Sequence, residues 1–269
     1  MRDFAASAQV TSASRDRLVP PGPGGEILLA GAVRRFRALS GYEEPLELRV
    51  TTTVPREVGL GGSSAIVIAA LRALSAAHDV ELAVDDLARV ALAVEVEECG
   101  IAAGLQDRIV QAREGLLFMD CGPTGTFEEL DPARLPALYL AWLPAAAAPS
   151  GVVHAELRQR HAAGDPDVLA ALSELAGLAT GARDALVAGD RTELARCIDG
   201  SLELRRRLMP VDRRLTDLAR VARSVGASAN STGSGGAIVG VLPSEEQWPL
   251  LSERLHAAGC ATLRPTVVG

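Results

Sequence analysis

The sequence contains no lysine, so all 27 of its basic side chains are arginines. This absence excludes a Walker-type phosphate loop, which places a lysine directly after its glycines. Aromatic residues are also scarce, at 3% of the chain, and the formal net charge is −7. Because nucleic acids and anionic membranes attract basic surfaces, we expect neither of them as a partner.

Long apolar runs are missing as well. No run approaches the ~18 residues that a membrane-spanning helix needs, and the first residues carry no apolar segment of the secretory type. The four cysteines, Cys99, Cys121, Cys197 and Cys260, lack metal-binding spacing. We therefore expect reduced thiols in a cytoplasmic protein, either a monomer or a homodimer. A chain of 269 residues is long enough for one large domain or two medium-sized domains with a sizeable core.

Glycines and serines gather in the stretch 55–70, which reads PREVGLGGSSAIVIAA. The β-branched run before it predicts a strand, and the Ala- and Leu-rich run after it, to about Ala77, predicts a helix. Glycine lets the backbone approach an anion closely, and the first N–H groups of a helix have no partner within that helix. The stretch predicts a phosphate-binding loop, although Ser63 as an ordinary helix N-cap is an alternative. A dinucleotide fingerprint is excluded because its third glycine is missing.

The same residues carry a family resemblance. Pro55, Gly59-Leu60 and Ser63-Ser64-Ala65 together resemble the nucleotide loop of the GHMP kinases, and the closest likeness is to the glucuronokinase branch of sugar 1-kinases. The resemblance implies ATP as cofactor. It also implies that the phosphates of ATP are bound by Gly59, Leu60, Gly61, Gly62, Ser63 and Ser64.

The remaining patterns alternate between strand and helix. Strands are expected at 4–11, 46–54, 115–120, 138–143, 238–242 and 261–267, and helices at 26–39, 85–99, 153–163, 167–188, 192–208, 212–225 and 244–258. This order fits an α+β protein. The resemblance implies a ribosomal-protein-S5-like N-terminal domain at 1–133 and a ferredoxin-like C-terminal domain at 134–269. The N-terminal motif of the family, a strand with an Ala-Pro-Gly-Arg-Val-like sequence, has no counterpart before Phe4, so we expect this motif to be absent.

A second group of residues supplies two acids. The stretch 100–111 reads GIAAGLQDRIVQ, and Glu95 precedes it on an expected helix. The resemblance implies that Glu95 holds Mg²⁺ together with Ser63, and that Asp107 is the catalytic acid beside the acceptor hydroxyl. Mg²⁺ favours hard oxygen ligands, and a carboxylate can accept or orient a hydroxyl proton. Glu97 and Glu98 are rivals for Glu95, and Asp107 as a helix N-cap is the alternative for that residue.

A third group lies in the second half of the chain, where residues 231–237 read STGSGGA. This turn resembles the third motif of the GHMP kinases, which closes over the nucleotide phosphates. The resemblance implies nucleotide binding by Gly233, Ser234, Gly235 and Gly236. A hairpin turn also recruits glycines, so the pattern alone is weak.

Two further positions are candidates for substrate contact. His154 lies in a stretch, SGVVH, that resembles a sugar-kinase segment near the acceptor. Arg205, Arg206 and Arg207 resemble a run of the glucuronokinase branch. One of these arginines could bind the carboxylate of a uronate with two hydrogen bonds, and Arg206 is taken as the candidate. The alternatives to substrate contact are that His154 lies on a surface loop and that the arginines lie at a solvated helix end.

Together these patterns predict an ATP- and Mg²⁺-dependent kinase that phosphorylates a sugar or sugar acid, glucuronate-like, at the anomeric hydroxyl. Another specificity within the family, for a galactose-like sugar or a mevalonate-like acid, is an alternative. A catalytically inactive nucleotide-binding homologue is a further alternative, motivated by the expected absence of the N-terminal motif.

Overall fold

The computed structural model describes residues 3–121, 125–144, 151–233 and 235–267. The chain divides into two compact units. The amino-terminal unit comprises Asp3–Val54 and Gly61–Leu130. The carboxy-terminal unit contains Pro55–Leu60 and the chain from Asp131 onward. Six residues of the glycine-rich loop thus belong to the later unit.

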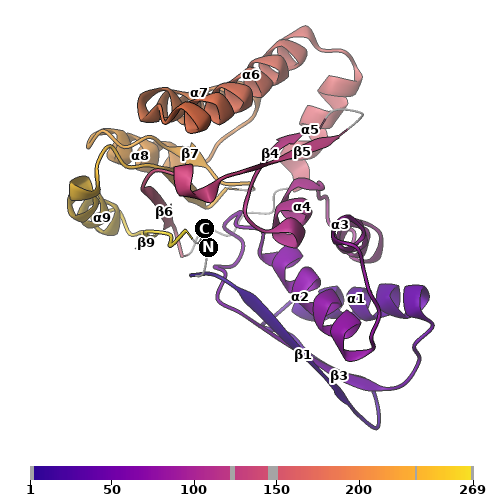
Figure 1. Cartoon of the computed structure of the whole chain (residues 1–269). Coiled ribbons are helices and arrows are strands. Elements are labelled where there is room, and N and C mark those ends of the chain that lie inside the picture. Colours follow the sequence, from indigo (N-terminus) through magenta and orange to yellow (C-terminus); the bar gives the residue numbers. More distant parts are fainter. Residues whose placement is uncertain (1–2, 122–124, 145–150, 234, 268–269) are drawn as a thin grey trace. The chain divides into compact units, whose positions relative to one another are not determined.

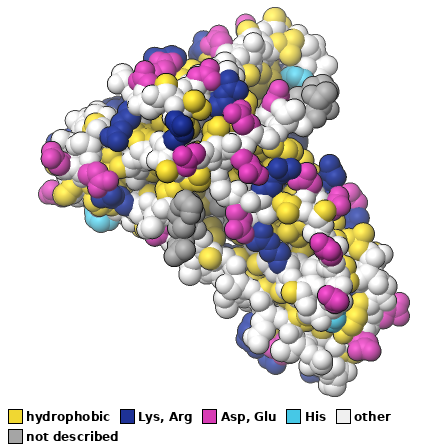
Figure 2. Space-filling model, in the orientation of Figure 1, with side chains coloured by type: hydrophobic (Ala, Val, Ile, Leu, Met, Phe, Trp, Pro, Cys, Tyr) yellow, Lys and Arg dark blue, Asp and Glu magenta, His cyan; other side chains and the backbone are white. Residues whose placement is uncertain are grey.

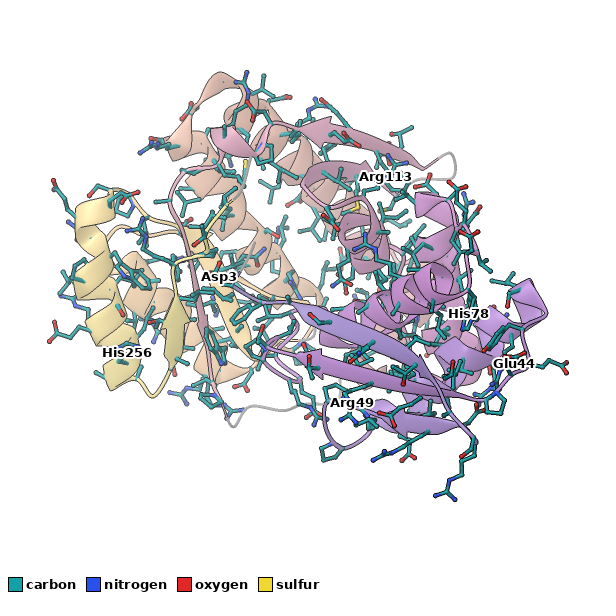
Figure 3. The ribbon with its side chains drawn as sticks, turned by 60° about the horizontal axis from the view of Figure 1, so that its bottom comes forward. Asp3, Glu44, Arg49, His78, Arg113 and His256 are labelled. Atoms are coloured by element: carbon teal, nitrogen blue, oxygen red, sulfur yellow. The ribbon has the colours of Figure 1, made fainter. Side chains whose placement is uncertain are left out.

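The amino-terminal unit contains a three-stranded sheet (Figure 1). Its order is β1 (Ala6–Ser12), β3 (Leu46–Thr52), β2 (Arg17–Val19), with β1 antiparallel and β2 parallel to β3. Alternate residues of β3 point to opposite faces of the sheet, so Leu48 is fully buried while Arg49, labelled in Figure 3, is exposed.

Helices pack on one face of this sheet. The helix α2 (Gly62–Ala77) lies against β1 and β3, with α1 (Gly25–Ser40) beside it. Next come α3 (Val84–Ala93), a π-helical turn η1 (Val94–Glu98) and α4 (Gln106–Arg113), followed by the hairpin β4 (Leu116–Asp120) and β5 (Thr126–Leu130). The apolar faces of sheet and helices form one core, in which Leu29, Phe36, Leu48, Leu71 and Leu74 have no exposed surface.

The carboxy-terminal unit contains a four-stranded antiparallel sheet. Its order is β7 (Asn230–Ser231), β8 (Ala237–Val241), β6 (Leu138–Trp142), β9 (Ala261–Leu263). The helices of this unit are α5 (Gly151–Ala162), α6 (Pro166–Ala188), α7 (Arg191–Leu208), α8 (Arg213–Arg223) and α9 (Trp248–Ala257), with short 3-10 turns η2 (Pro132–Arg134) and η3 (Glu245–Gln247). Its core centres on Tyr139, Leu202, Ile238 and Leu251.

The predicted α+β class is confirmed, and most predicted elements lie within a few residues of the observed ones. The expected helix 85–99 is instead α3 followed by the π-helical turn η1. Acidic and arginine side chains are interspersed on the face of the molecule shown in Figure 2. Within the described ranges, no helix combines the length and apolar character needed to cross a bilayer.

Candidate active site

The glycine-rich loop turns sharply before α2. Gly59 and Gly61 have φ angles of 71° and 67°, in the left-handed region that favours glycine. Gly61 is the N-cap residue of α2 and makes no side-chain cap bond, while Ser63 is already the second helical residue. The alternative that Ser63 is an ordinary N-cap is therefore wrong, and its hydroxyl is used elsewhere.

The carbonyl of Gly61 is held from two sides in the amino-terminal unit. Ser64 Oγ and Gln111 Nε2 each donate a hydrogen bond of 2.9 Å to it. A Cβ atom at Gly61 would lie only 2.7 Å from Gln111 Nε2 and 3.8 Å from Asp107 Cγ. The start of α2 and one face of α4 therefore converge at this glycine. Its left-handed φ would strain any larger residue, and an added Cβ atom would displace the amide of Gln111.

Glu95 lies beside Ser63. The hydroxyl of Ser63 donates a hydrogen bond of 2.6 Å to Glu95 Oε1, and the side chain of Glu95 is fully buried. Its rivals face another way: Glu97 pairs with Arg35, and Glu98 pairs with both Arg34 and Arg35 on α1. Their side chains thus serve helix packing, while the wide π-helical turn carries Glu95 inward.

Arg108 is a partner of Glu95 that the sequence analysis missed. Its Nε donates to Glu95 Oε2 at 2.6 Å, and its Nη1 donates to the carbonyl of Gly104 at 2.8 Å. Arg108 is 4% exposed, so this ion pair is buried. The only sequence signal was its position next to Asp107, which does not indicate which acid it would meet.

Asp107 is the second residue of α4, and the N-cap residue is Leu105. The alternative that Asp107 is a helix N-cap is therefore wrong. Its side chain is 58% exposed and lies 3.5 Å from Arg108 Nη1.

In the carboxy-terminal unit, the second glycine-rich turn packs on the first half of the loop. Thr232 Oγ1 donates a hydrogen bond of 2.7 Å to the carbonyl of Val58. A Cβ atom at Gly236 would lie 2.9 Å from Val58 Cα, and one at Gly233 would lie 3.3 Å from the carbonyl oxygen of Gly59. Close backbone approach explains these glycines. Ser234 lies outside the described residues.

Of the three consecutive arginines on α7, only Arg205 faces this turn. It donates 2.8 Å hydrogen bonds to the carbonyls of Ser231 and Gly233, and burial lowers the pKa of its guanidinium. Arg206 pairs with Glu203 and Arg207 with Glu174, all with exposed side chains. Arg206, the predicted substrate contact, thus has a carboxylate partner on its own helix. The side chain of the other predicted contact, His154 in α5, is outside the described part of the structure.

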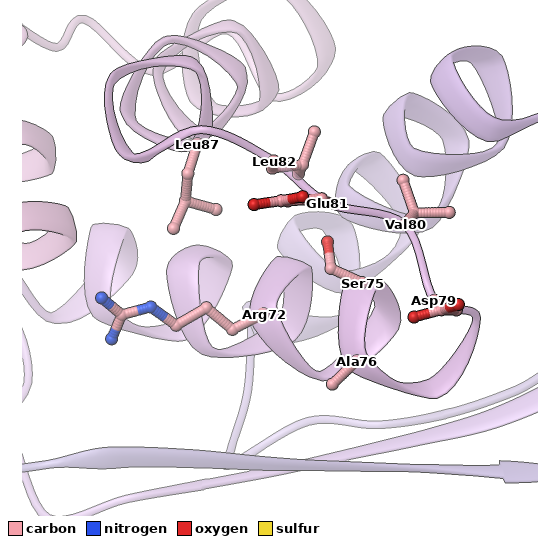
Figure 4. Close-up of a pocket in the computed structure, with 8 residues that line it drawn as sticks. All are labelled: Arg72, Ser75, Ala76, Asp79, Val80, Glu81, Leu82 and Leu87. Atoms are coloured by element: carbon pink, nitrogen blue, oxygen red, sulfur yellow. The ribbon is translucent and has the colours of Figure 1, made fainter.

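A hollow at the opposite end of α2 is separate from these residues (Figure 4). It is lined by Arg72, Ser75, Ala76, Asp79, Val80, Glu81, Leu82 and Leu87. At 1.5 Å per residue, the helix places Ser75 about 18 Å from Ser63. The hollow is therefore too distant to belong to the glycine turn.

Phosphoryl transfer is catalysed by positioning the reactants and by neutralising charge. The groups described above suit this chemistry: a glycine turn at a helix start, a serine beside a buried carboxylate, and a second, exposed carboxylate. A family model described as "GHMP kinases N terminal domain" matches residues 28–115. The chain is 34% identical over 263 residues to Glucuronokinase 1 of Arabidopsis thaliana. The matched region covers 91% of this chain and 72% of that relative. The chain therefore belongs to the GHMP kinase family, and it is an ATP-dependent kinase.

Solved structures agree on the fold. A Lin0012 protein from Listeria innocua matches with a TM-score of 0.81 at 16% identity, over 97% of this chain and 88% of that one. Lactococcus lactis galactokinase, crystallised with galactose, matches with a TM-score of 0.80 at 13% identity, over 98% and 86%. At such identities the likeness establishes the two-domain GHMP kinase fold alone.

The expectation that the N-terminal motif of the family is absent is wrong. The N-terminal domain of the family is found at residues 28–115, which include β3, the glycine-rich loop, Glu95 and Asp107. Before it, β1 is already a complete strand paired with β3 from Ala6 to Ser12. The case for an inactive homologue loses the observation on which it rested.

Proposed function

We propose that this protein transfers the γ-phosphate of ATP to the anomeric hydroxyl of a sugar, with a glucuronate-like sugar acid as substrate. The similarity to Glucuronokinase 1 over most of both chains supports this choice of acceptor. The single observation that carries the proposed chemistry is the convergence of Ser63 with Glu95, and of Asp107 with Gly61, at the start of α2.

In this proposal the backbone N–H groups around Gly61, Gly62, Ser63 and Ser64 bind phosphate oxygens. They are the unpaired donors of a helix start, and the positive end of the helix dipole favours an anion there. Gly59 and Leu60 belong to the same continuous loop. The turn with Gly233, Ser234, Gly235 and Gly236 is proposed to bind the nucleotide as well, since glycines let the backbone approach an anion closely.

Mg²⁺ fits the pair of Ser63 and Glu95, because a hydroxyl and a carboxylate oxygen only 2.6 Å apart are hard ligands that can share one ion. When bound, Mg²⁺ would neutralise charge on the transferring phosphate. We propose that Asp107 orients the acceptor hydroxyl and takes its proton. The exposure of its side chain gives a substrate access to the carboxylate.

We also propose that His154 and Arg206 contact the substrate. Galactose-like or mevalonate-like specificity is the alternative within the family. Relatives named mevalonate kinase match over less of this chain or at lower identity than Glucuronokinase 1. That of Saccharolobus solfataricus is 30% identical over 36% of this chain, and that of Pyrococcus furiosus is 23% identical over 75% of it, which favours a sugar acid as the substrate.

The test is a coupled assay of ADP release over a panel of sugars and sugar acids, with and without Mg²⁺. We expect turnover with a uronate and a fall in kcat of at least a hundredfold in Asp107→Ala, within the usual contribution of a general base. Asp86→Ala is the matched control, because Asp86 is an exposed acid paired with Arg89 on α3. Equal turnover in Asp107→Ala and Asp86→Ala would rule out the assigned role.

A further inference from the structure

Gln111 has a buried amide oxygen that the proposed mechanism does not use. Its Oε1 atom is buried and has no hydrogen-bond partner among the described residues. Buried polar atoms are nearly always paired, because an unpaired one loses its hydration without compensation. An unpaired acceptor beside an active site therefore requires an explanation.

The orientation of this amide is fixed by its surroundings. The atom that faces the carbonyl of Gly61, at 2.9 Å, must be the NH₂ group, since two carbonyl oxygens would repel each other. The amide oxygen is consequently held in place as an acceptor. It is satisfied by a partner that brings a donor, such as a hydroxyl group or a water, so an ionised phosphate oxygen is excluded as its partner.

The position of Gln111 points to the sugar. Asp107 and Gln111 are four residues apart on α4 and so lie on the same face of that helix. Both approach the place where a side chain at Gly61 would stand, Gln111 Nε2 at 2.7 Å and Asp107 Cγ at 3.8 Å. A sugar hydroxyl that presents its proton to Asp107 brings neighbouring hydroxyl groups into the same space.

We propose that Gln111 is a specificity-determining residue whose Oε1 accepts a hydrogen bond from a second hydroxyl of the acceptor sugar, while its Nε2 holds the glycine turn. This inference rests on the proposed sugar-kinase function. A sugar that lacks the matching hydroxyl leaves Oε1 buried and unpaired, and is rejected for that reason.

The test compares the accepted sugar with its monodeoxy analogues by kcat/KM. For the wild type we expect one analogue to be poorer by about tenfold to a hundredfold, the cost of one unpaired buried acceptor. In Gln111→Met, which has no acceptor, the same two sugars should differ by less than about threefold. Gln159→Met is the matched control, because it makes the same substitution at an exposed glutamine of α5. It should keep the discrimination of the wild type.

Each result separates the inference from the function on which it rests. No turnover of any sugar by the wild type overturns the proposed function itself. If Gln111→Met lowers kcat/KM by the same factor for the parent sugar and for every analogue, the discrimination of the wild type persists and the role of Oε1 is overturned. Gln111 is then only an anchor of the turn or the partner of a water. If Gln111→Met does not fold, Gln111→Leu replaces it. Leucine also lacks an acceptor, so discrimination that persists in Gln111→Leu contradicts the inference.

Discussion

Arg108 donates a hydrogen bond of 2.6 Å from Nε to Oε2 of Glu95, and neither side chain has appreciable contact with solvent. The proposed metal ligand is thus already neutralised by an arginine next to the proposed catalytic acid. Removal of one partner of a buried ion pair leaves an uncompensated charge, which costs more than the pair itself contributes. The coupling between Glu95 and Arg108 can therefore be measured in the free energy of unfolding.

We expect Glu95→Gln and Arg108→Met each to lower the free energy of unfolding by about 3 kcal/mol, and the double variant to lose clearly less than the sum. Urea denaturation at neutral pH measures this cycle. Arg35 and Glu97 form the control pair, since both are partly exposed and should cost at most about 1 kcal/mol. Strictly additive losses for Glu95 and Arg108 would show that the two do not interact.

Gly236→Ala should weaken both folding and ATP binding. The added methyl would meet Val58 Cα at 2.9 Å, where a Cβ atom essentially never lies, and it sits at a φ of 94°. Gly259→Ala is the control, since its φ is 82° but open space surrounds it. We expect about 1 kcal/mol of destabilisation in Gly259→Ala, from φ strain alone, and at least twice that in Gly236→Ala. Thermal melting with and without ATP compares the two, and equal effects would refute the close-approach argument.

Arg205→Met should raise the KM for ATP about tenfold with little change in the KM for the sugar. It removes two charged donors that fix the carbonyls of Ser231 and Gly233 in the second glycine-rich turn. Arg206→Met is the control on the adjacent position, where the guanidinium pairs with Glu203 at the surface. Initial rates over a range of ATP concentrations decide the point. A larger effect on ATP in Arg206→Met would reverse the assignment.

Asp16 makes part of the stability depend on pH. The hydrogen bond from Arg37, at 2.7 Å, holds the pKa of Asp16 below its usual 3.8. A lowered pKa means that this contribution is present above about pH 4 and is lost as the pH falls through the lower folded-state value. Asp16→Asn should cost about 0.5–1 kcal/mol at pH 7, because the pair is partly exposed.

Urea titrations of wild type and Asp16→Asn at pH 7 and near pH 3 measure this effect. The difference between the two proteins should shrink at the lower pH, because the carboxyl of the unfolded chain takes up its proton near its usual pKa of 3.8, before the folded protein does. A gap that widens with acid would contradict the sign of the shift.

Much of the protein follows from local sequence. The strand 46–54, the glycines before Ser63 and the helix that follows were all predictable, because backbone preferences of neighbouring residues decide them. The order of the motifs then gave the family, and with it the expected acids Glu95 and Asp107. The mixed α and β architecture followed from the alternation of periodicities.

Tertiary packing decided which side chains meet. Three acids lie within residues 95–98, and only the π-helical turn sends Glu95 toward Ser63 while Glu97 and Glu98 meet arginines of α1. Consecutive residues of a helix point about 100° apart, so the single arginine of 205–207 that faces the glycine turn is set by how α7 packs. Contacts such as Gln111 with Gly61 join distant positions, and no local pattern records them because their energy comes from the folded arrangement alone.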